Sequence, residues 1–181
     1  EPGTEYECRF ALTDPDGTSG QTSHIVRATT RTEPQPYAGG EVRHVYPPAW
    51  EGEKEEPHYT SLLEAYYGAG LGDWNVVWER RIQPGDTILM HAGLYKNIRL
   101  DYVDPMMTPF DGTNYLTIKG TPEKPITIKA AGDGAVVFDG DWNHKIFDVS
   151  ASAYHIFDGL TIRHTDVGIF AGMKEVNGAV G

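Results

Sequence analysis

The chain has 181 residues, of which 39% are hydrophobic, a mean hydropathy of −0.43 and a formal net charge of −11. Nucleic acids and anionic membranes are bound through basic surfaces, so this charge argues against both as partners. The sequence contains no apolar stretch of about 18 residues, so it predicts no membrane span.

Residues 1–32 predict part of a β-sandwich. Strands are expected at 5–11 and 23–30, joined by a loop whose Asp14-Pro15-Asp16-Gly17 favours special backbone angles. Two strands cannot bury a core, so we expect this unit to lack partner strands. Cys8 lies in an alternating stretch and is expected to be a small buried apolar side chain.

The same segment resembles a known domain family. Pro2-Gly3-Thr4-Glu5-Tyr6 is similar to the approach to the tyrosine corner of fibronectin type III domains, and residues 26–31 are similar to their final strand. The resemblance implies that residues 1–32 are the C-terminal remnant of such a domain. It also implies an extracellular or cell-surface protein. No leader precedes Glu1, and we expect the parent chain to extend beyond both ends.

Residues 33–56 are expected to form a linker. The stretch from Thr32 to Gly40 is rich in proline and glycine, and residues 51–56 form an acidic run typical of a solvated segment. His44 to Pro48 predicts a short edge strand that ends at proline.

A short helix is predicted from His58 to Gly68. Apolar residues recur at spacings of three and four, with Ser61 or Thr60 available as the N-cap and glycine at the end. The open end of a stack of strands needs a cap, so we expect this helix to pack on the first strands through Leu62, Leu63 and Tyr66.

Short alternating strands then recur at nearly constant intervals. Segments with the pattern apolar, variable, apolar, polar start at 116, 126, 136, 147 and 160, which is 10, 10, 11 and 13 residues apart. The intervening turns are too short for helical crossovers. Alternation places Ile126 and Ile128 on a buried face and Thr127 and Lys129 on a wet face. A parallel β-helix with coils of roughly 20 to 35 residues fits this rhythm, and an antiparallel sandwich stays open as the alternative.

Residues 83–170 resemble the right-handed parallel β-helix proteins of the pectin-lyase-like superfamily. Gln83-Pro84-Gly85-Asp86-Thr87-Ile88 is similar to their first coil, and Gly120 to Gly140 is similar to a run in polysaccharide lyases of the alginate lyase and chondroitinase B type. Tyr154 to Ile162 resembles the strand that follows. The predicted fold class is therefore all-β: a partial fibronectin III-like sandwich, then residues 57–181 as the capping helix and first coils of a parallel β-helix.

The resemblance implies a secreted protein that acts on an acidic polysaccharide by β-elimination. Such a lyase needs a base to remove the proton next to a carboxylate, and a cation to neutralise that carboxylate. In this family calcium with clustered carboxylates, and a Lys or Arg base, is the usual solution. The catalytic residues of this chain are not identified by the sequence, and we expect them mostly beyond residue 181.

A polar cluster follows the 136–139 strand and its successor. Asp139 and Asp141 are two residues apart and are candidate Ca²⁺ ligands, although Asp139-Gly140-Asp141 is more typical of a turn. Trp142, Arg163 and His164 are candidate substrate-binding residues. Arg163 is expected to point outward, where it would suit an acidic sugar or be solvated surface.

Other polar and aromatic residues give weaker indications of function. His91 is expected at the end of a strand rather than in a metal site. Trp74 and Trp78 are expected to stack on sugars or to pin the cap. The alternative to a lyase is a non-catalytic, adhesin-like β-helix.

Overall fold

The computed structural model describes residues 1–13, 15–17, 23–68, 81–96 and 113–172. The chain divides into two compact units, Glu1–Gln35 and Pro36–Gly181. Strands account for 47% of the described residues, whereas the single helix among them has six residues, so the fold is all-β. Among the described residues, no helix has the length and apolar character needed to cross a membrane. Trp74 and Trp78 lie outside the described residues.

The first unit is an antiparallel hairpin. Strand β1 (Glu5–Ala11) pairs with β2 (Ser23–Thr29), and Cys8 faces Val26 across the ladder. The hairpin has no covering layer of its own, so every residue of β1 is exposed. The expectation of a buried Cys8 is therefore wrong for this unit. The Tyr6 hydroxyl accepts a hydrogen bond from the amino group of Glu1.

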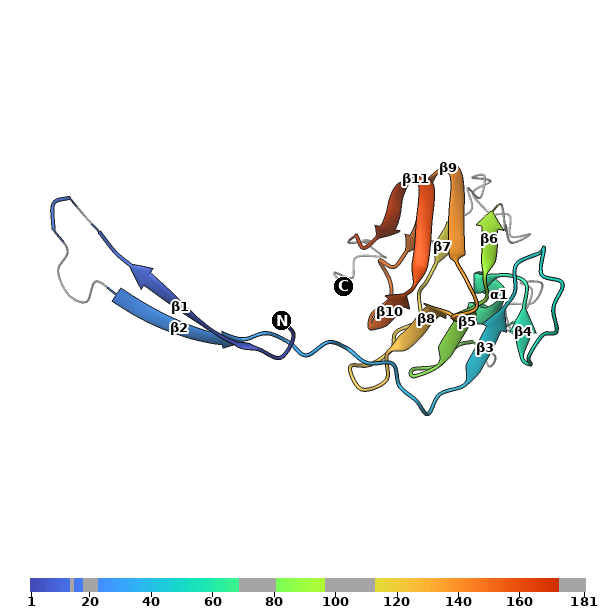
Figure 1. Ribbon diagram of the computed structural model, residues 1–181, viewed down its shortest axis with the longest axis horizontal. Helices are drawn as coiled ribbons and strands as arrows, with labels where there is room; N and C mark the ends of the chain where they lie inside the picture. Colours follow the sequence, from blue (N-terminus) through green and yellow to red (C-terminus); the bar gives the residue numbers. More distant parts are fainter. Residues whose placement is uncertain (14, 18–22, 69–80, 97–112, 173–181) are drawn as a thin grey trace, which may run out of the picture. The chain divides into compact units, whose positions relative to one another are not determined.

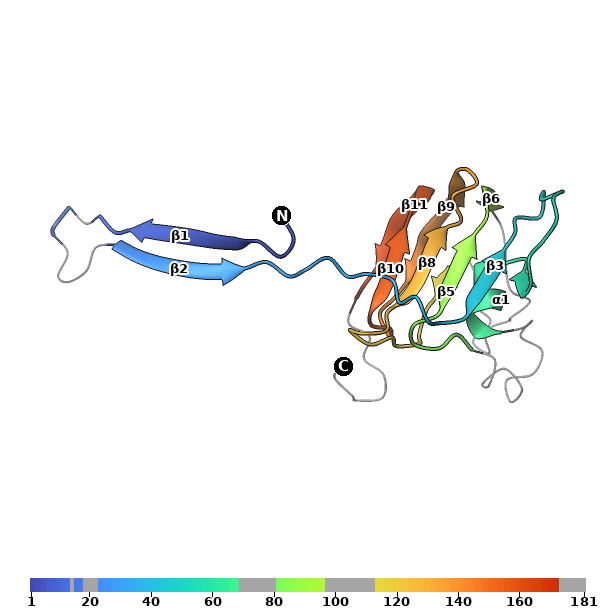
Figure 2. The same ribbon diagram turned by 60° about the horizontal axis from the view of Figure 1, so that its bottom comes forward.

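The second unit contains two parallel sheets (Figure 1). The first has the order β10-β8-β5-β3-β4 and the second the order β11-β9-β6, with β7 also on β9. Figure 2 shows β10, β8, β5 and β3 side by side. All described pairings in this unit are parallel, which excludes the antiparallel sandwich here. The strands of the first sheet are β3 (Val42–Val45), β4 (His58–Tyr59), β5 (Thr87–Met90), β8 (Ile126–Ala130) and β10 (His155–Asp158), and those of the second are β6 (Gly93–Lys96), β7 (Asn114–Tyr115), β9 (Val136–Asp148) and β11 (Leu160–Phe170).

The chain passes alternately between these sheets, from β5 to β6, from β8 to β9 and from β10 to β11. Each pass adds one strand to each sheet in parallel register. Thr87 pairs with Thr127, and Ile126 with His155, so successive passes are offset by 40 and 29 residues in the first sheet. The later offset falls in the expected coil length, whereas the earlier one is longer.

The core lies between the two sheets. Ile88, Ile126, Ile128, Val136 and Phe147 are completely buried. Burial of such side chains is the main term that stabilises a small domain. Thr127, which was expected on a wet face, is also completely buried, and its hydroxyl has no partner among the described residues.

The predicted capping helix is confirmed, but it begins later than expected. Helix α1 (Leu62–Tyr67) has Ser61 as its N-cap and Gly68 in the left-handed conformation at its end. The Ser61 hydroxyl accepts the backbone N–H of Glu64 at 3.2 Å, and the Glu64 carboxylate accepts the backbone N–H of Thr60, the residue before the N-cap, at 3.0 Å. Leu62, Leu63 and Tyr66 are buried in the core cluster as predicted. Residues 58–59 form β4 instead of a first helical turn.

The segment 33–56 is not a linker throughout. Residues 42–45 form β3, which lies between β5 and β4 rather than at a sheet edge. The Asp86 carboxylate accepts backbone N–H bonds from Glu41 at 2.9 Å and from Gln83 at 2.7 Å, and so ties β3 to the turn before β5. A Cβ at Gly40 would lie 2.1 Å from the carbonyl oxygen of Gly85, so this contact requires glycine.

Two of the predicted strands differ in extent. The strand predicted at 116–119 is replaced by β7 at 114–115 and one isolated bridge from Lys119 to Ala153. The segments predicted from 136 and from 147 are both part of the 13-residue β9. This strand is continuous because it bends in the middle rather than ending there.

Candidate functional site

The bend in β9 is a bulge against β11. Arg163 pairs with Asp139 and Thr165 pairs with Asn143, so residues 140–142 lie opposite the single residue His164. A Cβ at Gly140 would lie 2.6 Å from the backbone oxygen of His164, so this position also requires glycine. Bulges of this kind re-aim side chains.

Backbone strain is concentrated at this bulge. Asp141, Trp142 and His164 have φ angles of 50°, 64° and 52°. Left-handed conformations cost non-glycine residues about 1 kcal/mol or more each. Such strain persists where surrounding contacts fix it, and it is most often found at functional sites.

Asp139 is the centre of the cluster. Its side chain is 4% exposed and accepts bonds from Arg163 Nε at 2.8 Å and from His164 Nδ1 at 3.0 Å. Its other oxygen accepts the backbone N–H of Asp141 at 3.0 Å. These interactions, with the Asp141 N–H the strongest, lower the pKa of Asp139 to about 2. The carboxylate is therefore ionised at neutral pH and orients both basic side chains.

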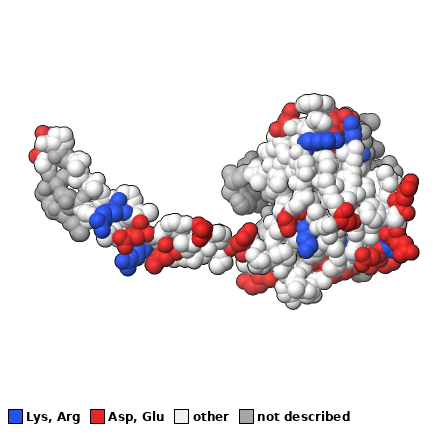
Figure 3. Space-filling model, viewed as in Figure 1, with Lys and Arg blue, Asp and Glu red and all other residues white. Residues whose placement is uncertain are grey.

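A third strand adds a cation. Lys96, the last residue of β6, places its Nζ 2.8 Å from a carboxylate oxygen of Asp141. This hydrogen bond raises the pKa of Lys96, so the ammonium stays charged. Lys96 and Arg163 together balance the two carboxylates at neutral pH. The charges of these two cations and two carboxylates therefore cancel. The chain as a whole has a net charge of −11, and the face of the second unit in Figure 3 shows more acidic than basic residues.

Trp142 supplies an open aromatic surface. Its indole stacks on the imidazole of His164, with ring centroids 5.1 Å apart and an interplanar angle of 28°. Trp142 is nevertheless 78% exposed. A large aromatic ring that is oriented by stacking and remains exposed to solvent is suited to stacking against the apolar face of a sugar ring.

The five residues selected from the sequence therefore lie in one place: Asp139, Asp141, Trp142, Arg163 and His164. Together with Lys96 they form what we call the bend cluster. Lys96 was missed, because nothing local in its sequence links it to residues 45 positions later. Asp139-Gly140-Asp141 is a bulge inside β9 rather than the predicted turn, although the Asp139 carboxylate bonds the backbone N–H of Asp141 as an aspartate does in a turn. Arg163 points outward as expected, with 49% of its side chain exposed, but it is paired rather than simply solvated.

The bend cluster does not fit the predicted calcium site. The described residues contain no group of three or more His, Cys, Asp or Glu side chains that could hold a metal ion. Asp139 and Asp141 are instead engaged by Arg163, His164 and Lys96. A cation would have to displace these partners.

Comparison with known proteins adds no relative. No family model matches the chain, and no curated protein or solved structure matches it. The function must therefore be argued from the bend cluster and its surroundings.

Proposed function

We propose that the chain belongs to a secreted or cell-surface carbohydrate-active protein that binds an acidic polysaccharide at the bend cluster and cleaves it by β-elimination. The scaffold would be a parallel β-helix, begun by the coils that alternate between the two sheets and capped by α1. The hairpin at residues 5–29 would be the end of a fibronectin type III-like domain. The resemblance in sequence and the parallel, alternating strands support this assignment.

The observation that carries the proposal is the combination of Trp142 and Arg163 on one exposed bend. Trp142 offers a face on which a sugar ring can stack. Arg163 uses its Nε for Asp139, and no described residue bonds its two terminal nitrogens. These nitrogens can form a bidentate pair with a sugar carboxylate.

His164 is the group best placed to act as the base. Asp139 is ionised and accepts a hydrogen bond from Nδ1, so Nε2 of the neutral ring carries the lone pair. The side chain is 45% exposed, which leaves it accessible. A base that is oriented by a buried carboxylate is the usual arrangement for proton abstraction.

The proposed reaction uses these groups in a defined order. Arg163 neutralises the uronate carboxylate while Nε2 of His164 removes the proton on the adjacent carbon. The electron pair of that C–H bond forms the C=C bond, and the glycosidic C–O bond breaks. The imidazolium of His164 then returns the proton to the departing oxygen. Lys96 is held protonated by Asp141 and is therefore suited to binding rather than to proton abstraction.

The full 181-residue chain should be incubated with alginate, pectate and glycosaminoglycans, and the unsaturated product followed by its ultraviolet absorbance. His164→Gln should abolish product formation and leave binding in place. His144→Gln is the matched control, because His144 lies on the neighbouring strand β9 and is exposed, and it pairs only at 3.7 Å with Asp166. Absence of product from every acidic polysaccharide would overturn the elimination chemistry.

A non-catalytic, adhesin-like protein is the second candidate. It is favoured by the complete pairing of Asp139 and Asp141 with basic groups, which suits a static binding surface. Binding of polysaccharide that depends on Trp142, without any product, would select this candidate.

A further inference from the structure

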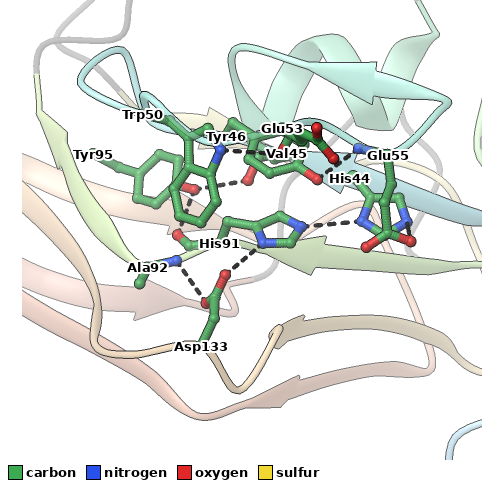
Figure 4. Close-up of polar contacts among 10 residues, drawn as sticks. All are labelled: His44, Val45, Tyr46, Trp50, Glu53, Glu55, His91, Ala92, Tyr95 and Asp133. Carbon is green, nitrogen blue, oxygen red and sulfur yellow. Dashed lines mark hydrogen bonds and ion pairs between the residues drawn. The ribbon is translucent and has the colours of Figure 1, made fainter.

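A second polar network, which shares no residue with the bend cluster, lies at the carboxyl ends of β3 and β5 (Figure 4). Asp133, His91, His44 and Glu55 follow one another in a row. The Asp133 carboxylate is 2.6 Å from His91 Nδ1, and His91 Nε2 is 3.0 Å from His44 Nδ1. His44 Nε2 is 3.9 Å from the carboxylate of Glu55.

Both imidazoles are almost completely enclosed. Each side chain is 9% exposed, whereas the Asp133 and Glu55 side chains are 32% and 77% exposed. The ring of Tyr46 stacks on His91 at 4.0 Å, and Trp50 covers it at 5.3 Å. This row of four side chains therefore joins two accessible carboxylates through two buried imidazole rings.

When both imidazoles are neutral, counting the protons in the row fixes the tautomer of each ring. Burial raises the pKa of Asp133, but hydrogen bonds from His91 and from the Ala92 N–H outweigh it and hold that pKa below its usual range. The ionised carboxylate accepts the Nδ1 proton of His91, so His91 Nε2 must accept the Nδ1 proton of His44. His44 Nε2 is then bare and faces another acceptor, the Glu55 carboxylate.

One added proton changes the contact between His44 and Glu55 at the other end of the row. With both nitrogens of His91 protonated, His91 donates to Asp133 and to His44 Nδ1, and His44 carries its proton on Nε2. That N–H now faces Glu55. A second added proton would place N–H against N–H across the 3.0 Å contact and break it.

Other titratable and charged side chains lie near the two imidazoles, but none of them replaces the hydrogen bonds of the row. Tyr95 donates its hydroxyl proton to the backbone oxygens of Val45 and His91. The Lys54 ammonium lies 5.8 Å from the centroid of the Tyr46 ring. His58 contacts the Tyr46 ring edge to face and pairs with Glu56. Burial lowers the pKa of His44, which keeps its ring neutral at pH 7.

We propose that Asp133, His91, His44 and Glu55 form a single proton-binding relay, and that one added proton fastens the 47–57 loop to the first sheet through the pair of His44 and Glu55. The loop is already attached nearby, since the Glu55 N–H donates to the Tyr46 hydroxyl at 2.9 Å. The added bond would strengthen this attachment in acid.

The tautomers can be tested directly in the full chain labelled with ¹⁵N-histidine. Two-bond ¹H–¹⁵N correlation spectra at pH 8 should show both His44 and His91 as Nδ1–H tautomers, which are the minor form in free histidine. On acidification the His91 ring should become doubly protonated while His44 switches to Nε2–H, with one shared midpoint. An Nε2–H tautomer of either ring at pH 8, or two independent midpoints, would overturn the relay.

The loop is tested by hydrogen exchange of residues 51–56. After correction for the intrinsic effect of pH, protection should rise roughly two- to fivefold between pH 8 and the acid side of the midpoint, as for an exposed ion pair. Glu55→Gln should lose this rise, and Glu51→Gln, in the same loop and with the same change of charge, should keep it. An unchanged rise in Glu55→Gln would overturn the proposal.

Discussion

The indole of Trp142 is stacked on the imidazole of His164, although the two residues come from neighbouring strands and both have left-handed backbone angles. The bulge makes this possible, because three residues of β9 lie opposite one residue of β11. The stack holds the indole in a fixed orientation while leaving it 78% exposed. Fixing a binding group before the ligand arrives lowers the entropic cost of binding.

Removal of this ring should weaken binding of polysaccharide. Trp142→Ala is expected to raise the Kd for an acidic oligosaccharide roughly tenfold, because a lost aromatic stacking contact costs about 1 kcal/mol or slightly more. Calorimetric titration measures this change. Tyr154→Ala removes another exposed aromatic ring outside the bend cluster and should leave the Kd unchanged. Equal losses in the two variants would argue against a site at Trp142.

Asp139 should make stability depend on acid pH. Its pKa is lowered to about 2 in the folded chain, so the folded state holds its proton less tightly than the unfolded state. Its contribution is therefore complete above the ordinary pKa near 4 and disappears as the pH falls towards 2. Asp139→Asn should flatten this part of the stability curve, measured by urea unfolding between pH 2 and pH 6. Parallel curves for the two proteins would contradict the assigned ionisation.

Gly140 should not tolerate a side chain. A methyl group there would lie 2.2 Å from Asn143 Oδ1 and 2.6 Å from the backbone oxygen of His164. Gly140→Ala is expected to lower the free energy of unfolding by about 1–3 kcal/mol, as in other overpacked sites. Gly168→Ala is the matched control on β11, since its Cβ would make ordinary contacts at 3.5 Å. Similar losses for both would contradict the close approach at the bulge.

The core between the sheets should be sensitive to cavities. Ile128 on β8 is completely buried, so Ile128→Ala should cost about 2–5 kcal/mol of unfolding free energy in denaturant melts. Ile169→Ala, which truncates a side chain that is 44% exposed, should cost much less. If the two substitutions were equivalent, the two sheets would not enclose a shared core.

Sequence periodicity was sufficient for several of the strands and for the cap. Alternation located β8, and the spacing of Leu62, Leu63 and Tyr66 located the buried face of α1. At β3 it predicted a short edge strand from His44 to Pro48, whereas the strand runs from Val42 to Val45 and lies between β5 and β4. The pairing of β3 with β5, about 45 residues later, leaves no local signal in the sequence.

The candidate site was predictable in composition but not in geometry. The residue types at 139–142 and 163–164 indicated a polar and aromatic cluster. The bulge register, the left-handed angles and the approach of Lys96 all depend on tertiary pairing of β6, β9 and β11. The basic partners of Asp139 and Asp141 also come from other strands, so the sequence alone could not show that these two carboxylates are paired.

Binding of an acidic oligosaccharide at the bend cluster is tested most directly by ¹H–¹⁵N spectra of the labelled full chain. A uronate oligomer should shift the indole N–H signal of Trp142 and the backbone signals around Arg163, and a neutral oligomer of the same length should not. The shifts should weaken as salt is added, because they rest on exposed charges. No shift at Trp142, or equal shifts with the neutral oligomer, would contradict the account.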